Sequence, residues 1–414
     1  AVDTGRVRFP RAEPVRGLGL RVRDAPVREL LDDVEGQLSL SGSVSHLGWL
    51  NQLIANTYGA DIDGTADLGA TLVLREGWLA AGTEARLVSD DLVVGVLDYQ
   101  ANGRGSVRLE IADGGRRPDA SIDVRLQDAV FKRPHEDIAF IEAVDLQMRA
   151  VARDLSYDGP TEDVSVHLAI PVARVTDMRV YNRYLPQDSP LQILGGSAEL
   201  AVDVTLEPAD AGGWVRLNAP SLTIRLETQE LSGDLGLDVT LAGGRPEDMA
   251  FDISGSTLRL DNFRVSGDAA SREGAAWNAT VRLARADTVW RPPVQVSADA
   301  DLVMKDSSPI VAMLSNYRGK HGWIEQLLTV GRIEGEARLR MRHDQIVFPY
   351  AFADSDEIAI GAKGVIDGQR RDGVILARYR RLKGLLKIQD GKRSFDLIRP
   401  QKKFDAYTPT GPAE

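Results

Sequence analysis

The chain has 414 residues, of which 43% are hydrophobic and 27% are charged, a balance typical of a folded protein and not of a disordered one. Its formal net charge of -11 argues against a nucleic-acid-binding protein, because neutralising phosphates requires clustered Lys and Arg. The chain has no cysteine, so disulfides, thiolate nucleophiles and cysteine-ligated zinc are excluded.

The sequence holds no candidate membrane-spanning helix, because none of its apolar runs approaches about 18 residues. Its opening residues, AVDTGRVRFP, lack the apolar core of a signal peptide. We therefore expect that a membrane anchor or signal has been removed from this chain.

Most of the chain alternates apolar and polar residues with a period of two, beginning with the segment Gly64–Arg75. The same alternation recurs in Ala120–Gln127, Asp163–Ile170, Gly196–Glu207, Asp234–Leu241 and Ser256–Gly267. This pattern is typical of antiparallel strands with one face in water, whereas parallel sheets show longer apolar runs and intervening helices. We predict about two dozen strands, with a bulge at Phe263, where the alternation slips by one residue.

Three segments break the two-residue period and are predicted to cross the sheet. Ser45–Tyr58 carries a helical apolar stripe, and Pro309–Val330 places a proline at the first helical position after a serine cap. Asp177–Leu194 is a weaker helical or irregular piece, because two prolines interrupt it.

A short five-residue motif, which we call the recurring word, follows each crossing segment: GTADL at Gly64, GSAEL at Gly196 and GEARL at Gly335. The offsets of 132 and 139 residues indicate a large repeated unit, in which the crossing segment ends at the glycine and a long strand begins. The alternative is that any strand start rich in these common residues looks like this.

The repeat divides the chain into four parts. Residues 1–62 hold N-terminal strands and the first crossing helix, and residues 63–175 hold the first β-groove repeat. The second repeat covers 176–305. Residues 306–414 hold a crossing helix, the third repeat and a basic C-terminal tail.

So many strands with an aliphatic face create an apolar surface that three short segments are too few to cover. The sheet then either folds against itself around a closed core, or curls into a groove that holds something apolar. Periodicity alone favours the closed core.

Glycine-started strands such as GSAELAVDVTL, SGDLGLDVTLAGG and LRLDNFRVSG, with a crossing segment before each block, resemble the bacterial AsmA-like family of the TamB and YhdP type. The likeness covers Gly64 to about Asp367. It rests on the alternation pattern of the strands and the layout of the repeats, and not on one motif. The expected N-terminal anchor is absent, and the C-terminal end matches no pattern of the family.

That family is similar to eukaryotic bridge-like lipid transfer proteins, whose repeating β-grooves stack around an apolar channel. The resemblance implies a mainly β protein with an elongated antiparallel repeating β-groove, a curled sheet with a few short crossing helices. It also implies a periplasmic location, with the full-length protein anchored in the inner membrane.

In this interpretation the apolar positions of the strands line the groove and contact lipid. The predicted lining residues are Leu68, Leu72, Leu74, Ile122, Val124, Leu126, Leu200, Val202, Val204, Leu206, Leu235, Leu237, Val239, Leu241, Leu258 and Leu260.

Candidate catalytic and metal-binding residues are few. The histidines stand apart at His46, His135, His167, His321 and His343. The sequence contains no HExxH, GxSxG or Walker motif, and the acidic stretch at Asp61–Asp67 lacks EF-hand spacing. We therefore predict a protein that is not an enzyme, with no catalytic residue, metal or cofactor.

The C-terminal segment is basic in an otherwise acidic chain, with twelve Lys and Arg against three Asp from Arg370 to Lys403. The candidate contacts for anionic headgroups or an acidic partner are Arg378, Arg380, Arg381, Lys383 and Lys387. The alternative is a solvated face of the last hairpin. The final residues, TPTGPAE, are predicted to be disordered.

The sequence thus predicts a non-enzymatic periplasmic lipid transport protein that carries phospholipid or a related lipid between the inner and outer membranes. The expected partners are that lipid, the inner membrane through the missing anchor, and an envelope protein at the C-terminal end, but no nucleic acid. The alternative is an extracytoplasmic scaffold, a β-solenoid with a dry core that binds proteins. A carbohydrate-active β protein is less favoured, because no exposed aromatic row accompanies paired carboxylates.

Overall fold

The computed structural model describes residues 4–8, 35–51, 61–76, 78–96, 99–113, 117–133, 139–154, 163–186, 189, 191–226, 229–266, 276–306, 331–342, 345–355, 358–367, 370–390 and 392–409. They fall into two compact units, unit 1 (residues 1–173 and 201–210) and unit 2 (residues 174–200 and 211–414). The described strands belong to one 25-stranded antiparallel sheet that does not close on itself. This confirms the predicted mainly β, open antiparallel sheet.

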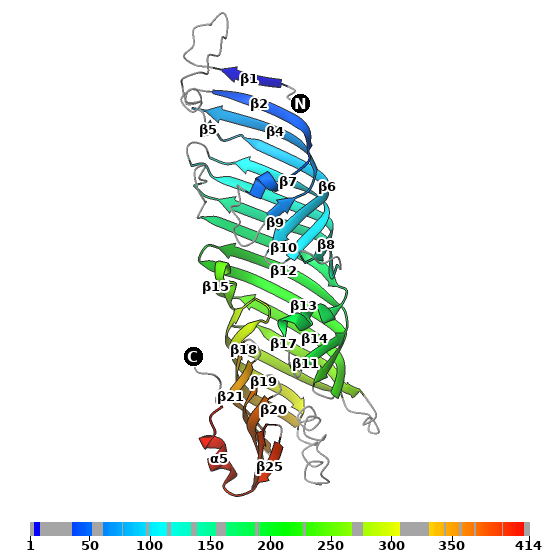
Figure 1. Cartoon of the computed structure of the whole chain (residues 1–414), viewed down its shortest axis with the longest axis vertical. Helices are drawn as coiled ribbons and strands as arrows, with labels where there is room; N and C mark the ends of the chain where they lie inside the picture. The colour runs from blue at the N-terminus through cyan, green and yellow to red at the C-terminus, as the bar shows by residue number, and fades with distance from the viewer. Residues whose placement is uncertain are drawn as a thin grey trace, which may run out of the picture. The chain divides into compact units, whose positions relative to one another are not determined.

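In unit 1 the long strands pair with their neighbours along the chain (Figure 1). The strands are β1 (Thr4–Arg8), β2 (Glu35–Val44), β3 (Asp61–Asp63), β4 (Ala66–Arg75), β5 (Trp78–Leu79), β6 (Glu84–Val96), β7 (Tyr99–Ile111), β8 (Ala120–Lys132), β9 (Ile141–Ala152) and β10 (Val164–Val175). A short 3-10 helix, η1 (Gly48–Leu50), lies between β2 and β3 in the sequence, and its residue Leu50 is fully buried.

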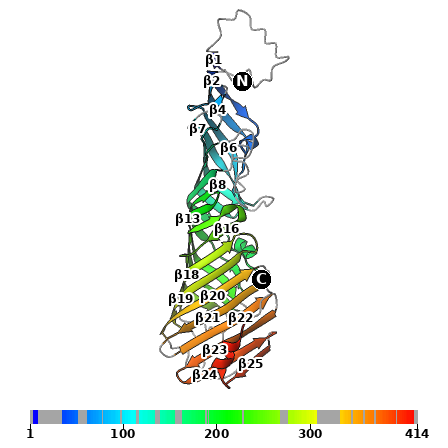
Figure 2. The same cartoon turned by 90° about the vertical axis from the view of Figure 1, so that its left-hand side faces the viewer.

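In unit 2 the strands from β17 to β25 pair in chain order, and Figure 2 shows β18 to β25 one after another. Before them, β11 pairs with β13 and β14 pairs with β17. From β11 onward the strands are β11 (Leu191–Gly195), β12 (Ala198–Glu207, which unit 1 shares), β13 (Asp210–Leu226), β14 (Gln229–Leu241), β15 (Gly243–Arg245), β16 (Ala250–Asp252), β17 (Thr257–Ser266), β18 (Trp277–Val289), β19 (Gln295–Asp306), β20 (Gly331–Arg342), β21 (Gln345–Asp354), β22 (Ile358–Asp367), β23 (Arg370–Tyr379), β24 (Leu382–Gln389) and β25 (Lys392–Asp396). The helical segments are η3 (Met178–Tyr184), η4 (Pro246–Asp248) and α5 (Pro400–Ala406).

The predicted crossing segments are shorter than expected where the structure describes them. In Ser45–Tyr58 the 3-10 helix η1 occupies three residues, and residues 52–60 lie outside the described ranges. In Asp177–Leu194 the helix η3 begins after the cap Asp177 and ends at Tyr184, and β11 follows. The predicted helix at Pro309–Val330 lies outside the described residues.

The first two copies of the recurring word occupy the same local structure. Gly64 and Gly196 have φ angles of 122° and 127°, and the strands β4 and β12 begin two residues later. Each glycine carbonyl accepts a hydrogen bond from a buried residue beside the preceding 3-10 helix, from Leu47 N at 3.1 Å and from Met178 N at 2.9 Å. The prediction that a long strand starts at this glycine is therefore confirmed for these two copies. The glycine does not end the helix itself, because the short strands β3 and β11 lie between the 3-10 helix and the glycine.

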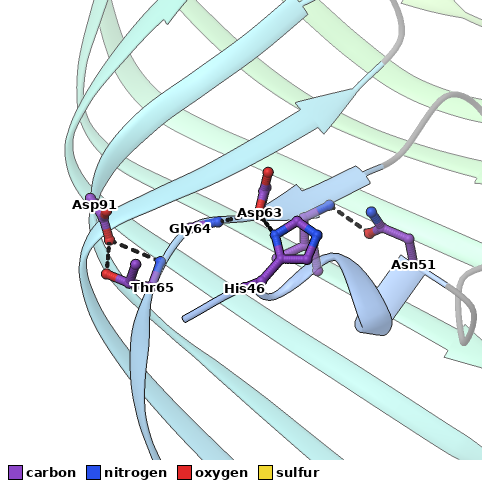
Figure 3. Close-up of polar contacts among 7 residues, drawn as sticks. His46, Asn51, Asp63, Gly64, Thr65 and Asp91 are labelled. Carbon is purple, nitrogen blue, oxygen red and sulfur yellow. Dashed lines mark hydrogen bonds and ion pairs between the residues drawn. The ribbon is translucent and has the colours of Figure 1, made fainter. Parts of the chain in front are cut away.

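A second pair of contacts repeats with the same spacing. Asn51 Oδ1 accepts a hydrogen bond from Ile62 N at 2.7 Å, and Asn182 Oδ1 accepts one from Ile193 N at 2.7 Å (Figure 3 shows the first). Asn182 Nδ2 also donates to Ile193 O at 2.8 Å. In both copies the asparagine, directly after η1 or within η3, links this helical segment to the short strand that precedes the glycine.

The third copy of the word behaves differently, and the prediction for it was wrong. Gly335 is not at a strand start, because β20 begins at Gly331 and Gly335 pairs with Leu302 inside the ladder. A Cβ at Gly335 would lie 2.7 Å from the Cβ of Ala353. This glycine is required by a close approach between strands and not by a turn.

Most long strands change direction at a point where two successive residues face outward. In β8, Gln127 and Asp128 are both exposed between buried Leu126 and Ala129, and Asp128 has a φ of 52°. Equivalent outward pairs are Asp90–Asp91 in β6, Val144–Asp145 in β9, Pro171–Val172 in β10, Pro220–Ser221 in β13 and Asp261–Asn262 in β17. We call these pairs corners. The extra outward residue returns the apolar alternation to the same face, as β-bulges do.

The corner of β17 is the bulge predicted at Phe263, where the register with β18 shifts between Leu260 and Phe263. Aspartate carboxylates accept hydrogen bonds from residues at or beside several corners. Asp91 Oδ1 accepts hydrogen bonds from Thr65 N at 3.1 Å and Thr65 Oγ1 at 2.8 Å (Figure 3). Asp234 accepts from Ser221 N at 3.1 Å and from Asn262 Nδ2 at 2.9 Å.

We expect Gly196→Ala to destabilise the protein by roughly 1 to 3 kcal/mol, because a φ of 127° belongs to a region that is nearly exclusive to glycine. The added Cβ would also lie 3.2 Å from Leu222 Cα. Gly195→Ala is the control, since its Cβ would meet no atom within 4 Å. Urea unfolding followed by circular dichroism measures both variants, and equal midpoints would contradict the strained position.

A pH series tests the carboxylate fastening of the corners. Hydrogen bonds from Asn262 and Ser221 lower the pKa of Asp234 below its usual range. The ionised carboxylate is thus favoured in the folded protein, and its contribution is present above the unfolded pKa and lost as pH falls through the folded pKa.

Asp234→Asn should therefore lower the melting temperature at neutral pH, and the difference from the wild-type protein should shrink below about pH 4. Thermal melts across this range provide the measurement, with Asp301→Asn, an exposed carboxylate in β19, as control. A difference that stays constant with pH would argue against the fastening role.

Candidate functional site

In unit 2 the apolar faces of nine strands line up in register. Each residue in the following series is directly opposite the next on the neighbouring strand: Leu217, Leu237, Leu258, Val281, Leu302, Gly335, Ala353, Ile360 and Ala377. We call this series the apolar row. It runs from β13 to β23 without a polar residue.

The apolar row is not fully covered by the described chain. Leu217, at its first strand, is buried, but every residue from Leu237 to Ala377 is partly exposed. A parallel series beside it, also partly exposed, consists of Leu283, Ala300, Ala337, Ala351, Ala362 and Ile375. Together these residues form a broad aliphatic surface, much of it floored by small side chains.

One side of this surface ends in a closed cluster. Phe263 is fully buried, and its ring lies 5.2 Å from that of Trp277. Met304 and Ile333 pack in the same cluster, each no more than 5% exposed, and Leu302 of the apolar row packs against it. The cluster thus bounds the partly exposed surface with a dry apolar wall.

From β13 to β20 the opposite face of these strands is charged. Asp238 lies 3.2 Å from both Arg216 and Arg259, and Asp299 lies 3.2 Å from its cross-strand partner Arg338. Exposed ion pairs of this kind contribute little stability each. They do, however, keep this face hydrated. Because successive side chains of a strand point to opposite faces, the same strands carry the apolar row on one side and the charges on the other.

Unit 1 has a comparable row with a different environment. Leu87, Val107, Val124 and Met148 are also opposite one another in register, yet each is at most 2% exposed. Neighbouring residues on the same face, such as Leu126 and Leu146, are equally buried. This part of unit 1 has a dry, closed core.

The predicted lining residues also include buried and partly exposed positions, but this division does not follow the two units, since Leu68, Leu72 and Leu74 of unit 1 are partly exposed and Leu200 of unit 2 is buried. The buried ones are Ile122, Val124, Leu126, Leu200, Val204 and Leu206. The partly exposed ones are Leu68, Leu72, Leu74, Val202, Leu235, Leu237, Val239, Leu241, Leu258 and Leu260. Sequence reasoning missed the continuation of the surface through β19 to β23, although Ala298, Ala300, Leu302 and Met304 alternate as clearly as the residues it named.

The predicted headgroup residues lie on the hairpin of β23 and β24. Arg380 and Arg381 form its turn, and Arg378 is directly opposite Lys383. Lys387 lies further along β24, opposite Val374. All five side chains are exposed, which fits both contact with an anionic partner and a solvated hairpin face.

The C-terminal helix α5, which sequence reasoning did not predict, packs on the face opposite the apolar row, where Phe404 joins a buried cluster with Val374, Leu376 and Leu385. Phe404 is buried over Gly361, where a Cβ would lie 2.6 Å from its ring. Lys363 Nζ donates to the carbonyl oxygens of Phe404 at 3.1 Å and Tyr407 at 3.2 Å. The helix leaves the face that carries the apolar row uncovered at this end.

The polar cluster around η1 has the appearance of a site but serves the repeat. His46 Nδ1 lies 2.9 Å from Asp63 Oδ1, and Asp63 Oδ1 accepts a hydrogen bond from Gly64 N at 2.7 Å (Figure 3). Burial and the neighbouring Asp63 raise the pKa of Asp61. His46 is largely exposed, and Asp63 is its partner in this cluster.

The remaining histidine that the structure describes, His167, lies 3.1 Å from Asp203 on exposed strands. His135, His321 and His343, for which no site was predicted, lie outside the described residues. Within the described ranges no group of three or more His, Asp or Glu side chains is placed to hold a metal ion.

Comparisons with protein-family models, with curated proteins and with solved structures found no match to the chain. The resemblance to the AsmA-like family therefore stays a prediction. Among the described residues, no helix is both long and apolar enough to span a membrane.

Single cysteines can test the contrast between the two rows, because the chain has none of its own. We expect Leu258→Cys, in the partly exposed row, to react with a small maleimide in the folded protein. Val124→Cys should react only on unfolding, since Val124 is 1% exposed. Thr280→Cys, on the charged face, serves as the reactive control. Equal protection at positions 124 and 258 would show that both rows are closed.

Proposed function

We propose that the chain is a non-enzymatic lipid carrier whose acyl-chain site is the apolar row of unit 2. In this proposal it passes phospholipid or a related lipid between the membranes of a cell envelope. The observation that carries the proposal is the uninterrupted, partly exposed series from Leu237 to Ala377. The periplasmic location and the membrane anchor rest on the sequence resemblance alone.

The physical argument concerns water. Leaving aliphatic surface in contact with water costs about 25 cal/mol per Å², so a long exposed series is costly unless something apolar covers it. Acyl chains are a suitable ligand, because the aliphatic side chains of this surface are apolar and provide no hydrogen-bonding group. Nine strands about 4.8 Å apart give the row a length of roughly 38 Å, which exceeds the roughly 15 Å of one leaflet's hydrocarbon core.

Small side chains add room for such a ligand. Ala300, Ala337, Ala351 and Ala362 form one series beside the apolar row, and Gly335 leaves the row without a side chain at β20. The charged opposite face of β13 to β20 would keep that part of the loaded protein in water. Selectivity for a headgroup would have to come from polar residues at the border of this aliphatic surface.

The scaffold alternative is favoured by one observation, the closed core of unit 1. A protein built only of such cores would hold no lipid and would act through its exposed surfaces. The two proposals therefore differ in whether the apolar row of unit 2 takes up lipid.

A matched pair of double variants tests the lipid proposal. Val281 and Leu302 are opposite each other on the apolar face of β18 and β19, and Thr280 and Val303 are opposite each other on the charged face of the same strands. We expect V281D/L302D to lose bound phospholipid, because two carboxylates would be desolvated by acyl chains. T280D/V303D adds the same charges to the same strands and should retain it.

Native mass spectrometry with organic extraction measures bound lipid, and circular dichroism confirms that each variant folds. If V281D/L302D does not fold, Ala300→Trp and Ala337→Trp fill the surface without adding charge and should also reduce lipid uptake. Wild-type protein that neither retains nor takes up phospholipid would favour the scaffold. Full lipid occupancy in a folded V281D/L302D variant would rule out the apolar row as the site.

A further inference from the structure

The last strands of unit 2 expose large apolar side chains to an unusual degree. Leu382 and Ile398 are each 72% exposed, Leu397 is 67% exposed and Phe395 is 54% exposed. We call these four residues the C-terminal apolar tip. Isolated exposed aliphatic residues are normal, but four large ones within one hairpin and the loop after it form a patch that needs a partner.

The pairing of β24 with β25 brings the tip together. Phe395 is opposite Leu386, and its ring lies over Gly384, where a Cβ would be 2.6 Å away. The ladder ends with Asp396 opposite Leu385, so the next residues, Leu397 and Ile398, follow toward the beginning of β24, where Leu382 lies.

The loop that carries Leu397 and Ile398 is held in place by Asp396. Its Oδ1 accepts a hydrogen bond from Ile398 N at 2.7 Å, and its Oδ2 pairs with Lys403 of α5. Hydrogen bonds from Lys403 and Ile398 lower the pKa of Asp396. The apolar side chains of the loop are thus presented on a fixed turn and are not simply part of a loose end.

Cations surround the tip. Arg380, Arg381 and Lys383 flank Leu382, and Lys392 and Arg399 flank the segment of Phe395 to Ile398, and all five side chains are exposed. Residues 378–403 contain ten Lys and Arg against two Asp, in a chain whose net charge is -11. The positive charge around the tip would therefore attract an anionic partner. The rest of the chain is acidic, so an anionic partner would repel it.

We propose that the C-terminal apolar tip docks on the surface of an anionic lipid bilayer. Cations would contact the headgroups while the four apolar side chains enter the boundary between headgroups and acyl chains, as amphipathic membrane-binding segments do. Leu382 and Phe395 lie on the same face of the sheet as Gly384 and Ala377, at the edge where the apolar row ends. The tip would thus place that end of the row against the membrane, a step that rests on the proposed lipid-carrier function.

Vesicle flotation with the full chain tests docking separately from lipid carriage. We expect the protein to float with phosphatidylcholine vesicles that contain phosphatidylglycerol, and to float weakly with phosphatidylcholine alone or at high salt. R380E/R381E/K383E should weaken binding by about tenfold or more, because each cation near an anionic surface contributes substantially.

The apolar contribution distinguishes a bilayer from an acidic protein. L397S/I398S should also weaken binding about tenfold, whereas V144S/V172S, at valines that are 65% and 60% exposed in unit 1, should bind as the wild type does. A dye on Ile398→Cys should shift to shorter emission wavelengths with anionic vesicles. Failure of the wild-type protein to bind would overturn the proposal, and so would unchanged binding by L397S/I398S, which would indicate a purely electrostatic partner.

Crossing the two sets of variants separates the failure of one proposal from that of the other. The folded V281D/L302D variant should dock on vesicles but carry no lipid. L397S/I398S should keep the lipid already bound but dock poorly. Docking without lipid in the wild-type protein would leave the tip supported and remove the carrier function.

Discussion

Two-residue alternation along strands that bend is the constraint on which the rest of this structure depends. A slip of one residue would turn every later apolar side chain toward water. The corners solve this by placing two residues outward where the strand bends, so that Leu126 and Ala129 of β8 remain on one face. Carboxylates such as Asp91 and Asp234 then satisfy backbone and side-chain donors beside these bends.

The same alternation gives two different interiors. In unit 1 the facing residues Val107 and Val124 are sealed, whereas in unit 2 the facing residues Leu258 and Val281 remain partly exposed. A sealed row contributes stability and holds no ligand. A partly exposed row of equal length is an energetic cost that a bound acyl chain would remove, which is why the lipid-carrier proposal is placed in unit 2.

Part of this arrangement could be predicted because its signals are local. The slip at Phe263 and the glycines at 64 and 196 are visible within a few residues. The third copy of the word misled, because Gly335 is set by its approach to Ala353 on the next strand. The short helix α5 was missed because seven residues barely show a helical period, and its stability comes from packing on distant strands.

The sequence by itself determined which side of each strand is apolar and, at the glycines and the Phe263 bulge, where the chain stops or bends, since these depend on neighbouring residues and backbone preference. Only the tertiary structure decided which apolar rows are covered. Coverage depends on side chains far away in the sequence, such as Phe263 and Trp277 beside Met304 and Ile333. Register likewise decided that Leu397 and Ile398 follow the ladder toward the beginning of β24, where Leu382 lies, because β24 and β25 pair as far as Leu385 and Asp396.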